Sequence, residues 1–536
     1  MQRKWKIVAG LAAVAVVAAG AVALGLRKQF GGHINALGVD LRAPAAYVAT
    51  PSLTALSRDL VKAPVLRELL TEDFAFYYEA HEDRLGLAGA IKRVAFEHET
   101  TWRDDLIALA MDQPSEVALW ADERGAARYW ALAMTRDALA RVIQGLGQIA
   151  AGDAQLSLIG EAPLASFGLQ SVPVYALQLS PRRTLAIASR GNRVVVLSDP
   201  GLLFDGERKA DGEAAKVLGQ LLSGDTGDQA LWRRHFGLAD AAGKAHTLVV
   251  GGELLALGYQ QFLPALQGLR LDVAPGGTAL NSWVRQGSAW PASPWTALPA
   301  QAAACAALPV DWVQTRRVLS GPDGKPKAVT VGGKDVGPAL AEMAKAFDGP
   351  AGICWYGGSQ LHTPLIVAHA GAGAPSAATV EAFMQWWLPS QAGWSPGEKT
   401  AQVNAPYGAK RQGEDVGYQM AFRRAGDWWL FSPDAALVAR AEDAIARRYP
   451  SVADTLGNGA KTAVATAAPA QIAELMKREA LAVLPPDQAN FRQAAENLLF
   501  PRLVSFGKLP AAQAVPAGAR DSQGWTALDW QPVTQR

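Results

Sequence analysis

The chain has 536 residues, of which 50% are hydrophobic and 19% charged, and this balance excludes an intrinsically disordered protein. Its 51 basic and 49 acidic residues leave a net charge of only +2, and no Lys/Arg-rich block occurs. Because nucleic-acid-binding proteins usually carry a concentrated basic surface, DNA and RNA are excluded as expected partners.

The first predicted element is a transmembrane anchor at residues 7–26. None of these twenty residues is charged or strongly polar. At 1.5 Å per residue, a helix of this length spans the roughly 30 Å hydrocarbon core of a bilayer. The alternative is a cleaved signal peptide, with Ala21-Val22-Ala23 as its cleavage site. The apolar run continues to Leu26 and is followed at once by Arg27-Lys28, which favours the uncleaved anchor.

The charges beside the anchor indicate its orientation. Arg3, Lys4 and Lys6 precede the anchor, and a short basic N-terminus commonly stays in the cytoplasm while a long following domain is translocated. No other stretch has eighteen consecutive apolar residues. We therefore expect one crossing of the bacterial inner membrane, a juxtamembrane linker at 27–45, and the bulk of the chain in the periplasm.

The length predicts several domains, since one domain usually has ~100–200 residues. We expect a first half at 46–286 and a second half at 302–536, joined by a Pro- and Trp-rich linker at 287–301. The halves have similar patterns of apolar runs, which predicts an internal duplication.

Five predicted elements recur in the same order. Strand-like runs at 112–120 and 128–134 correspond to 348–356 and 363–370, and a helix follows each pair, at 137–149 and 378–387. The turn and strand at 190–198 correspond to 424–432, and the strand at 244–250 corresponds to 461–466. This repeated strand–strand–helix order predicts an α+β fold, in which each half is an antiparallel sheet with helices packed on one face.

Cys305 and Cys354 are the two cysteines of the chain. An oxidising periplasm allows them to form a disulfide. The alternative is a pair of separate buried thiols, because free Cys behaves as a small hydrophobic residue. A zinc site requires further ligands, so no metal site is predicted.

No catalytic or cofactor-binding motif stands out. Glu97-His98-Glu99 begins like a metalloprotease helix, but Trp102 occupies the position of the second His. His362 and His369 lie seven residues apart on a predicted strand, so they face opposite sides of it. No catalytic, cofactor-binding or metal-binding residue is therefore predicted.

Tryptophan is abundant, and two pairs are adjacent in the sequence, Trp386-Trp387 and Trp428-Trp429. One interpretation is a surface that stacks on sugars or contacts a protein. The other is packing between helix and sheet, because Trp is mostly buried on average.

Two segments carry a family resemblance: DLVKAPVLRELLTEDFAFYYE at 59–79 and LGLAGAIKRVAFEHE at 85–99. They resemble an uncharacterised bacterial domain-of-unknown-function family of envelope proteins, often encoded beside bacterial alpha-2-macroglobulin-like proteins. The resemblance covers most of the chain beyond the anchor. It implies an envelope location and a protein partner, and it carries over no catalytic residue.

These observations together predict a non-enzymatic, membrane-anchored periplasmic scaffold or interaction protein, serving an alpha-2-macroglobulin-like system as the resemblance implies. The alternative is an envelope hydrolase or polysaccharide-binding protein with a cleft between the halves.

Overall fold

The computed structural model has described positions across most of the chain. They are residues 36–63, 113–121, 127–135, 156–163, 171–180, 183–205, 209–224, 230–238, 246–255, 263–288, 290, 293–321, 323–331, 334–359, 363–376, 378–380, 382, 394–399, 407–411, 417–483, 492–493 and 495–533. The predicted anchor at 7–26 and the predicted helix at 137–149 lie outside them. Within the described positions, no helix is long and apolar enough to cross a membrane.

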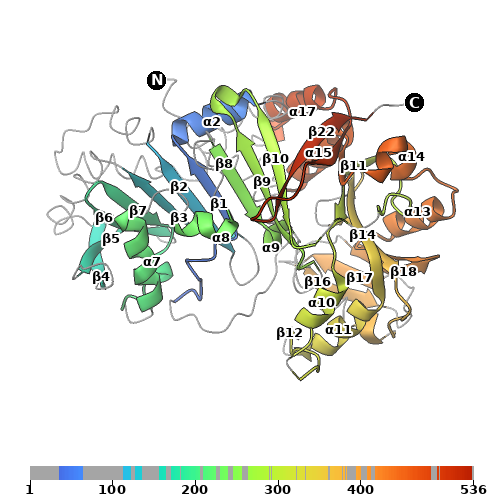
Figure 1. Ribbon diagram of the computed structural model, residues 1–536, viewed down its shortest axis with the longest axis horizontal. Helices are drawn as coiled ribbons and strands as arrows, with labels where there is room; N and C mark the ends of the chain where they lie inside the picture. The colour runs from blue at the N-terminus through green and yellow to red at the C-terminus, as the bar shows by residue number, and fades with distance from the viewer. Residues whose placement is uncertain are drawn as a thin grey trace. The chain divides into compact units, whose positions relative to one another are not determined.

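The chain divides into two compact units (Figure 1). Among the described residues, unit 1 comprises 36–251 and Arg270–Leu280, and unit 2 comprises Gly252–Leu269 and 281–533. The paired strands of each unit run antiparallel, and helices pack against them. The predicted antiparallel α+β architecture is therefore confirmed.

The sheet of unit 1 pairs its strands in the order β4-β5-β6-β7-β3-β2-β1-β8. Their bounds are Ala46–Thr50 (β1), Ser115–Ala121 (β2), Ala127–Thr135 (β3), Leu156–Pro163 (β4), Ser171–Ser180 (β5), Arg183–Arg190 (β6), Arg193–Leu197 (β7) and His246–Gly251 (β8). The helices are Leu53–Lys62 (α2), Pro200–Leu202 (η3), Gly212–Ser223 (α7), Leu231–Phe236 (α8) and Pro275–Gly277 (η6). Strand β9, Leu266–Val273, passes from unit 2 to unit 1 after Leu269.

Local sequence signals set these elements. The β6–β7 hairpin turns at Gly191, whose φ of 55° favours glycine. Helix α7 starts where the Asp211 side chain accepts hydrogen bonds from the backbone N–H groups of Glu213 and Ala214. It ends at Gly224, whose left-handed φ of 80° stops the helix.

Helices cover both faces of the unit 1 sheet. Val48 of β1 packs in one core with Leu56 of α2, whereas the adjacent Tyr47 contacts the ring of Trp232 on α8. Neighbouring residues of a strand point to opposite faces, so α2 and α8 lie on opposite sides. The prediction that helices pack on one face only was therefore wrong. The physical reason is that the strands are apolar on both sides, as in β7, where Val194–Leu197 are all buried.

Unit 2 pairs its strands in the order β10-β22-β21-β20-β11-β14-β15-β19-β18-β17-β16. Their bounds are Leu280–Gln286 (β10), Ala302–Leu308 (β11), Phe347–Tyr356 (β14), Leu365–Ala370 (β15), Trp394–Lys399 (β16), Tyr407–Arg411 (β17), Gly417–Ala425 (β18), Trp428–Ser432 (β19), Ala465–Ala467 (β20), Ala512–Ala517 (β21) and Trp525–Pro532 (β22), with a small hairpin of Thr330–Val331 (β12) and Lys334–Asp335 (β13). The helices are Gly252–Leu255 (α9), Trp312–Val318 (α10), Gly337–Lys345 (α11), Ala435–Ile445 (α13), Val452–Leu456 (α14), Gly457–Lys461 (η7), Pro469–Val483 (α15), Ala495–Leu499 (η8) and Phe500–Phe506 (α17).

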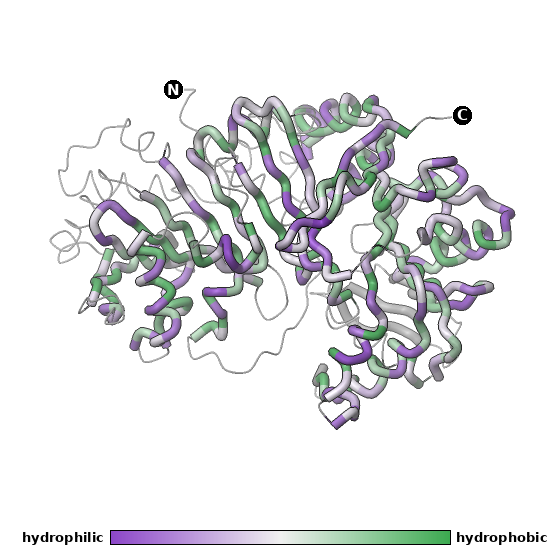
Figure 2. The backbone as a smooth tube through the Cα atoms, in the orientation of Figure 1, coloured by the Kyte–Doolittle hydropathy of each residue, from purple (hydrophilic) through white to green (hydrophobic). Residues whose placement is uncertain are grey.

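Unit 2 also has a core on each face of its sheet, and Figure 2 shows the hydrophobic stretches that build it. Ile353 packs with α10 and α11, and the adjacent Cys354 packs with α13 and α14. Trp295 and Leu298, from the predicted linker at 287–301, are fully buried in the second of these cores.

Candidate functional site

The segment that follows the predicted anchor is fixed to unit 1 by two indole side chains. Nε1 of Trp120 donates a hydrogen bond to the carbonyl oxygen of Asp40 at 2.8 Å, and Nε1 of Trp232 donates to that of Leu41 at 2.9 Å. Leu41 itself is buried. Because a buried carbonyl that loses its donor is costly, these two bonds hold the segment in one position.

Backbone hydrogen bonds fix both ends of the same segment. The N–H of Ala36 donates to the carbonyl of Phe204 at 3.0 Å, and the N–H of Ala45 donates to that of Leu119 at 2.7 Å. We call residues 36–45 the docked segment. It lies in the predicted juxtamembrane linker and leads directly into β1.

The rings under the docked segment form an aromatic cluster. Tyr47 contacts Trp232 and Phe236 with ring centroids 6.3 and 6.0 Å apart, and Trp120 meets Trp232 edge-on at 5.8 Å. Such contacts each add about 0.5–1.5 kcal/mol beyond burial of area.

A polar group borders this cluster. The Tyr47 hydroxyl donates to Oε1 of Glu116, and Nε of Arg233 lies 3.4 Å from the same oxygen. Burial, followed by the Glu116 charge, holds the pKa of Tyr47 well above its ordinary value. The phenol therefore stays protonated and acts as a hydrogen-bond donor.

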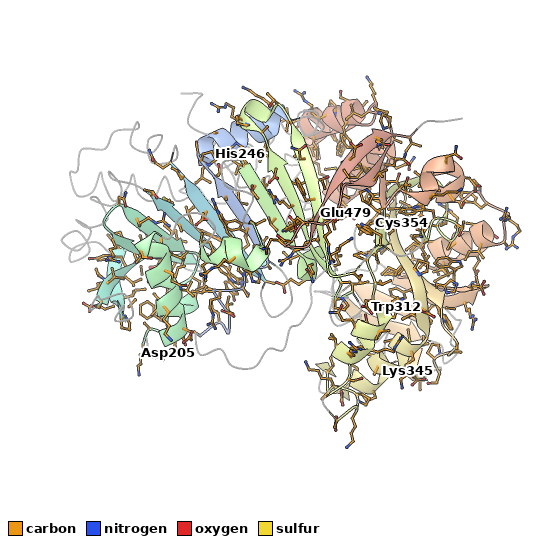
Figure 3. All side chains as sticks on the ribbon, in the orientation of Figure 1. Asp205, His246, Trp312, Lys345, Cys354 and Glu479 are labelled. Carbon is orange, nitrogen blue, oxygen red and sulfur yellow. A yellow bond between two sulfur atoms is a disulfide. The ribbon has the colours of Figure 1, made fainter. Side chains whose placement is uncertain are left out.

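A buried polar network surrounds His246, at the start of β8 (Figure 3). Its Nδ1 lies 2.8 Å from the Thr50 hydroxyl at the end of β1, and its Nε2 lies 3.1 Å from Oδ2 of Asp59 on α2. The N–H of Gly276 also donates to Oδ2 of Asp59, at 2.8 Å, and the exposed Arg58 pairs with Oδ1. The network joins β1, α2, β8 and η6.

Burial sets the charge states of this network. His246 has a lowered pKa because removal from water disfavours the imidazolium, although the Asp59 carboxylate acts in the opposite direction. Burial would raise the pKa of Asp59, but hydrogen bonds from His246, Gly276 and Arg58 outweigh it and lower the pKa. At neutral pH the network therefore contains a carboxylate and a neutral imidazole. The arrangement Asp–His–Thr has the order of a nucleophile triad, but the fully buried His246 is closed to a substrate.

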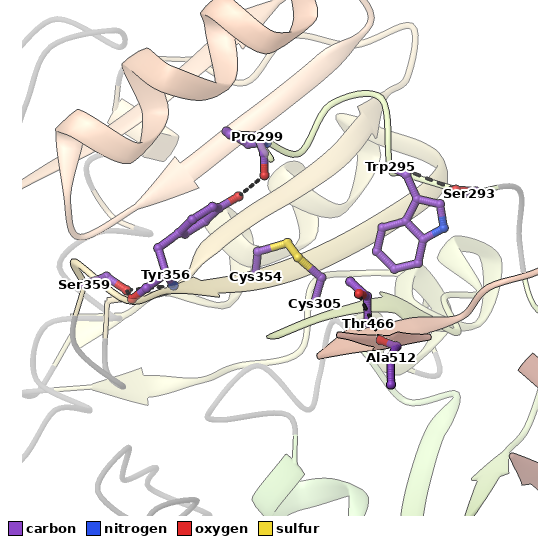
Figure 4. Close-up of a disulfide and its surroundings, with 9 residues drawn as sticks. All are labelled: Ser293, Trp295, Pro299, Cys305, Cys354, Tyr356, Ser359, Thr466 and Ala512. Atoms are coloured by element: carbon purple, nitrogen blue, oxygen red, sulfur yellow. Dashed lines mark hydrogen bonds between the residues drawn. A yellow bond between two sulfur atoms is a disulfide. The ribbon is translucent and has the colours of Figure 1, made fainter. Parts of the chain in front are cut away.

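Cys305 and Cys354 lie opposite each other on β11 and β14 and are joined by a disulfide (Figure 4). Both are buried in the same core as Trp295. The neighbouring Tyr356 donates its hydroxyl hydrogen bond to the carbonyl of Pro299 at 3.1 Å. The disulfide therefore ties the middle of the unit 2 sheet, away from solvent.

The other residues considered from the sequence are dispersed. His369 lies on β15, where its ring meets that of Trp428 edge-on at 5.5 Å, and Trp429 is buried against Phe422. His98, His362 and the pair Trp386-Trp387 lie outside the described residues. In the part of the chain that the structure describes, no group of three or more His, Cys, Asp and Glu side chains is placed to hold a metal.

Sequence reasoning missed the His246 network and the aromatic cluster. Thr50, Asp59 and His246 are far apart in the sequence and occur in no motif, so only the fold brings them together. One local signal existed for α2, since Ser52 is a good N-cap and its side chain accepts a hydrogen bond from the N–H of Ala55.

Comparisons with known proteins identify relatives along the whole chain. The model of a family described as "Uncharacterized protein conserved in bacteria (DUF2138)" matches residues 6–386 and 389–533. The "Uncharacterized protein YfaA" of Escherichia coli (strain K12) is 28% identical over 576 aligned residues, which cover 98% of this chain and 97% of that protein. The family resemblance inferred from the sequence is thereby confirmed.

Among solved structures, crystal forms IV and III of TP0453 match with 12% and 13% identity. They cover 47% and 48% of this chain, and 81% and 82% of the matched chains. Their TM-scores of 0.22 and 0.21 are too low to indicate a shared fold.

Proposed function

Because the chain belongs to the DUF2138 family of bacterial proteins, we propose that it is a membrane-anchored envelope scaffold that presents two related α+β halves to a protein partner. Residues 7–26 hold it in the inner membrane, and the rest lies in the periplasm. Its role is to bind and position, without catalysis.

The docked segment carries this proposal. Leu26 ends the apolar run, and Ala36 is already fixed on unit 1. Ten Cα steps separate them, and a fully extended chain spans at most ~3.6 Å per step, so unit 1 begins within about 36 Å of the bilayer. If residues 7–26 were a cleaved signal peptide, the docked segment would connect unit 1 to nothing, and a short connection would serve no purpose. A tethered scaffold benefits, because a partner at the membrane then meets it at raised effective concentration.

The strand order supports an internal duplication. Unit 1 contains the order β4-β5-β6-β7-β3-β2-β1-β8, and unit 2 contains β16-β17-β18-β19-β15-β14-β11-β20. Each strand has a counterpart at the same place in both the sheet and the chain. Sequential antiparallel strands follow many other orders, so a shared eight-strand order favours common descent of the halves.

The strand registers support the same proposal. Tyr47 pairs with Ala118 on one side and Val249 on the other. Cys305 pairs in the same way with Cys354 and Thr466. The sequence offsets predicted for these strands relate Ala118 to Cys354 and Val249 to Thr466, so pairing and sequence agree. In unit 1, the positions that correspond to Cys305 and Cys354 are therefore occupied by Tyr47 and Ala118.

One β-hairpin of unit 1 also corresponds to one of unit 2. Gly191 and Gly426 each occupy a turn with φ of 55°, between β6 and β7 and between β18 and β19. They are 235 residues apart, one more than the offset of 234 expected from the sequence. Alignment of the two turn glycines therefore shifts the correspondence between these hairpins by one residue.

The proposal is tested by co-purification from membranes. Full-length protein with a C-terminal tag, solubilised in mild detergent after cross-linking, is expected to retain a specific envelope partner, for which an alpha-2-macroglobulin-like protein is the first candidate. The matched control carries Trp120→Phe and Trp232→Phe, which remove both indole bonds to the docked segment. If the docked segment positions unit 1 for its partner, this double variant should no longer retain the partner that the unaltered protein retains. A chain that retains no specific partner contradicts the scaffold, and release of sugars from purified peptidoglycan or polysaccharide would instead support the alternative hydrolase.

A further inference from the structure

Two residues of unit 2 other than glycine have a left-handed backbone. Gln301, directly before β11, has a φ of 62°, and Arg447, one residue beyond the C-cap of α13, has a φ of 58°. Among the residues that the structure describes, no other non-glycine residue has a positive φ. This conformation favours glycine because a Cβ atom is crowded against the backbone. Long side chains at both positions therefore indicate a role for the side chains themselves.

Arg447 occupies the place at which a helix commonly ends on glycine. The N–H of Arg448 donates to the carbonyl of Asp443 at 2.8 Å, and the N–H of Arg447 donates to the carbonyl of Ala444 at 3.0 Å. These two bonds form a Schellman motif, in which the left-handed residue is usually glycine. The end of α13 is thus closed by an arginine in a conformation that suits glycine.

The helix of unit 1 that corresponds to α13 has the expected glycine. Helix α7 packs against β6 and β7 and ends at Gly224, whose φ is 80°. Helix α13 packs against β18 and β19, the counterparts of those strands in the proposed duplication. Because one half builds this helix end with glycine, the fold does not require an arginine at the same place in the other half.

The two left-handed residues lie in loops that are bonded to each other. The N–H of Ala300 donates to the carbonyl of Pro450 at 2.8 Å. The buried Tyr356 donates its hydroxyl hydrogen bond to the carbonyl of Pro299 (Figure 4). These bonds fix both loops, so the side chains that the loops carry are held ready for a ligand.

Tyr449 brings polar side chains of the two loops together. Its hydroxyl donates to Oε1 of Gln301 at 3.3 Å, and the guanidinium of Arg440 on α13 lies 5.8 Å from the centroid of its ring. The first contact leaves the amide N–H groups of Gln301 as donors, and the second holds Arg440 by a cation–π interaction. Arg447 precedes Tyr449 by two residues. Gln301, Arg440 and Arg447 are exposed, and we call these three residues the donor site.

The acidic residues of α13 are already paired. Asp443 lies 2.6 Å from a guanidinium nitrogen of Arg448, and Glu442 lies 3.1 Å from one of Arg423. They neutralise two other arginines and leave the positive charge of the donor site in place.

The acidic residue near Arg447 is also engaged. The N–H and the hydroxyl of Ser451 donate to Oδ2 of Asp454 at 2.7 and 2.8 Å. These bonds lower the pKa of Asp454, and the charge of Arg447 lowers it further. In the part of the chain that the structure describes, Arg440 and Arg447 form no ion pair.

We propose that the donor site receives a carboxylate from an acidic peptide segment of the protein partner. The proposal rests on the proposed scaffold function, because it names the surface with which unit 2 meets that partner. Gln301 offers amide N–H donors, and Arg440 and Arg447 offer guanidinium groups that match both oxygens of a carboxylate.

The mixed charge around the donor site favours a peptide over an extended anionic surface such as a bilayer. Glu442 and Asp443 lie on α13, and Asp454 lies on α14. A continuous layer of phosphate groups over the donor site would meet these three carboxylates as well. A carboxylate on a single side chain can contact the donors alone, so like-charge repulsion selects the smaller ligand.

Arg447→Gly tests the proposal because it should change stability and binding in opposite directions. Glycine adopts a φ of 58° without strain, so unit 2 of this variant should unfold at a higher urea concentration than in the unaltered protein. The variant also loses one guanidinium of the donor site. We expect the full-length variant in detergent to bind fluorescein-labelled poly-L-glutamate about tenfold more weakly, as measured by fluorescence anisotropy. Gln301→Gly should shift stability and binding in the same two directions.

Arg448→Gly is the matched control. It removes the same charge from the next residue, which pairs with Asp443 and has no left-handed φ. Unit 2 of this control should unfold at a lower urea concentration, because glycine there only adds freedom to the unfolded chain. Its affinity for poly-L-glutamate should stay within about twofold of that of the unaltered protein.

Labelled polyphosphate serves as a second probe and distinguishes a phosphate ligand from a carboxylate. Its denser charge is repelled more strongly by Glu442, Asp443 and Asp454, so it should bind more weakly than poly-L-glutamate. Tighter binding of polyphosphate that is lost in Arg447→Gly would assign the site to phosphate and overturn the peptide.

Two further results would overturn the donor site. One is unfolding of Arg447→Gly at the same or a lower urea concentration than the unaltered protein. The other is equal binding of poly-L-glutamate by both proteins.

Co-purification from membranes separates this proposal from the scaffold function. If tagged Arg447→Gly retains the partner as fully as the unaltered protein does, the donor site is refuted and the scaffold stands. If the unaltered protein retains no partner but binds poly-L-glutamate through Arg447, the scaffold is refuted and the carboxylate site is supported.

Discussion

The disulfide between Cys305 and Cys354 gives the most quantitative prediction for unit 2. We expect reduction of this bond to lower the free energy of unfolding of unit 2 by roughly 4 kcal/mol. The cysteines are 49 residues apart in the sequence, and the chain-entropy relation assigns about 4 kcal/mol to a closed loop of this length. The bond restricts the unfolded chain, so its removal acts mainly by freeing that chain.

The assay is urea unfolding of oxidised and reduced protein, followed by the fluorescence of tryptophans. Trp295 shares the core of the disulfide and is fully buried, so it should report unit 2. The double variant Cys305→Ala with Cys354→Ala is the matched control, since it removes the bond together with both sulfur atoms. It should unfold at or below the urea concentration that unfolds the reduced natural protein, because the lost volume adds a packing cost.

Two outcomes would refute this reasoning. One is unfolding of the oxidised and reduced proteins at the same urea concentration. The other is an intact mass, measured without reductant, that shows two free thiols.

The remaining predictions concern unit 1. Trp232→Phe leaves the Leu41 carbonyl without its indole donor and should destabilise unit 1 by about 1–3 kcal/mol. Proteolysis of the docked segment should become faster, and an unchanged rate would contradict the role of the indole. Gly277→Ala should destabilise more than Gly276→Ala in thermal unfolding, since both have positive φ but only Gly277 lies against the Asp59 backbone; equal losses would show that the contact with α2 is dispensable. Acidification below about pH 4 should lower the free energy of unfolding of unit 1. The pKa of Asp59 is lowered in the folded protein, so the stabilisation from its carboxylate is lost as the pH falls through that lowered pKa.

Sequence patterns predicted the strands whose apolar runs are continuous. The predicted strands at 112–120 and 348–356 correspond to β2 and β14, and the predicted turn at 190–193 is the β6–β7 hairpin. Such runs are readable because a central strand is buried on both faces. The same property misled the prediction of helix cover on one face.

Other elements gave no readable signal. β1 joins two strands that are distant in the sequence, and its run AYVAT is short and rich in alanine. The docked segment lies in the predicted linker at 27–45, yet its backbone is held by Trp120 and Trp232, whose contribution depends on the fold. The His246 network could not be predicted for the same reason: its side chains meet only after β1, β8 and α2 are assembled.

Protease accessibility in spheroplasts tests the central claim most directly. The proposal predicts that protease added to intact spheroplasts digests residues 36–533 while a cytoplasmic marker survives, and that deletion of residues 7–26 abolishes this export. If the chain resists the protease until the spheroplasts are lysed, the claim that residues 36–533 lie outside the cytoplasm is contradicted.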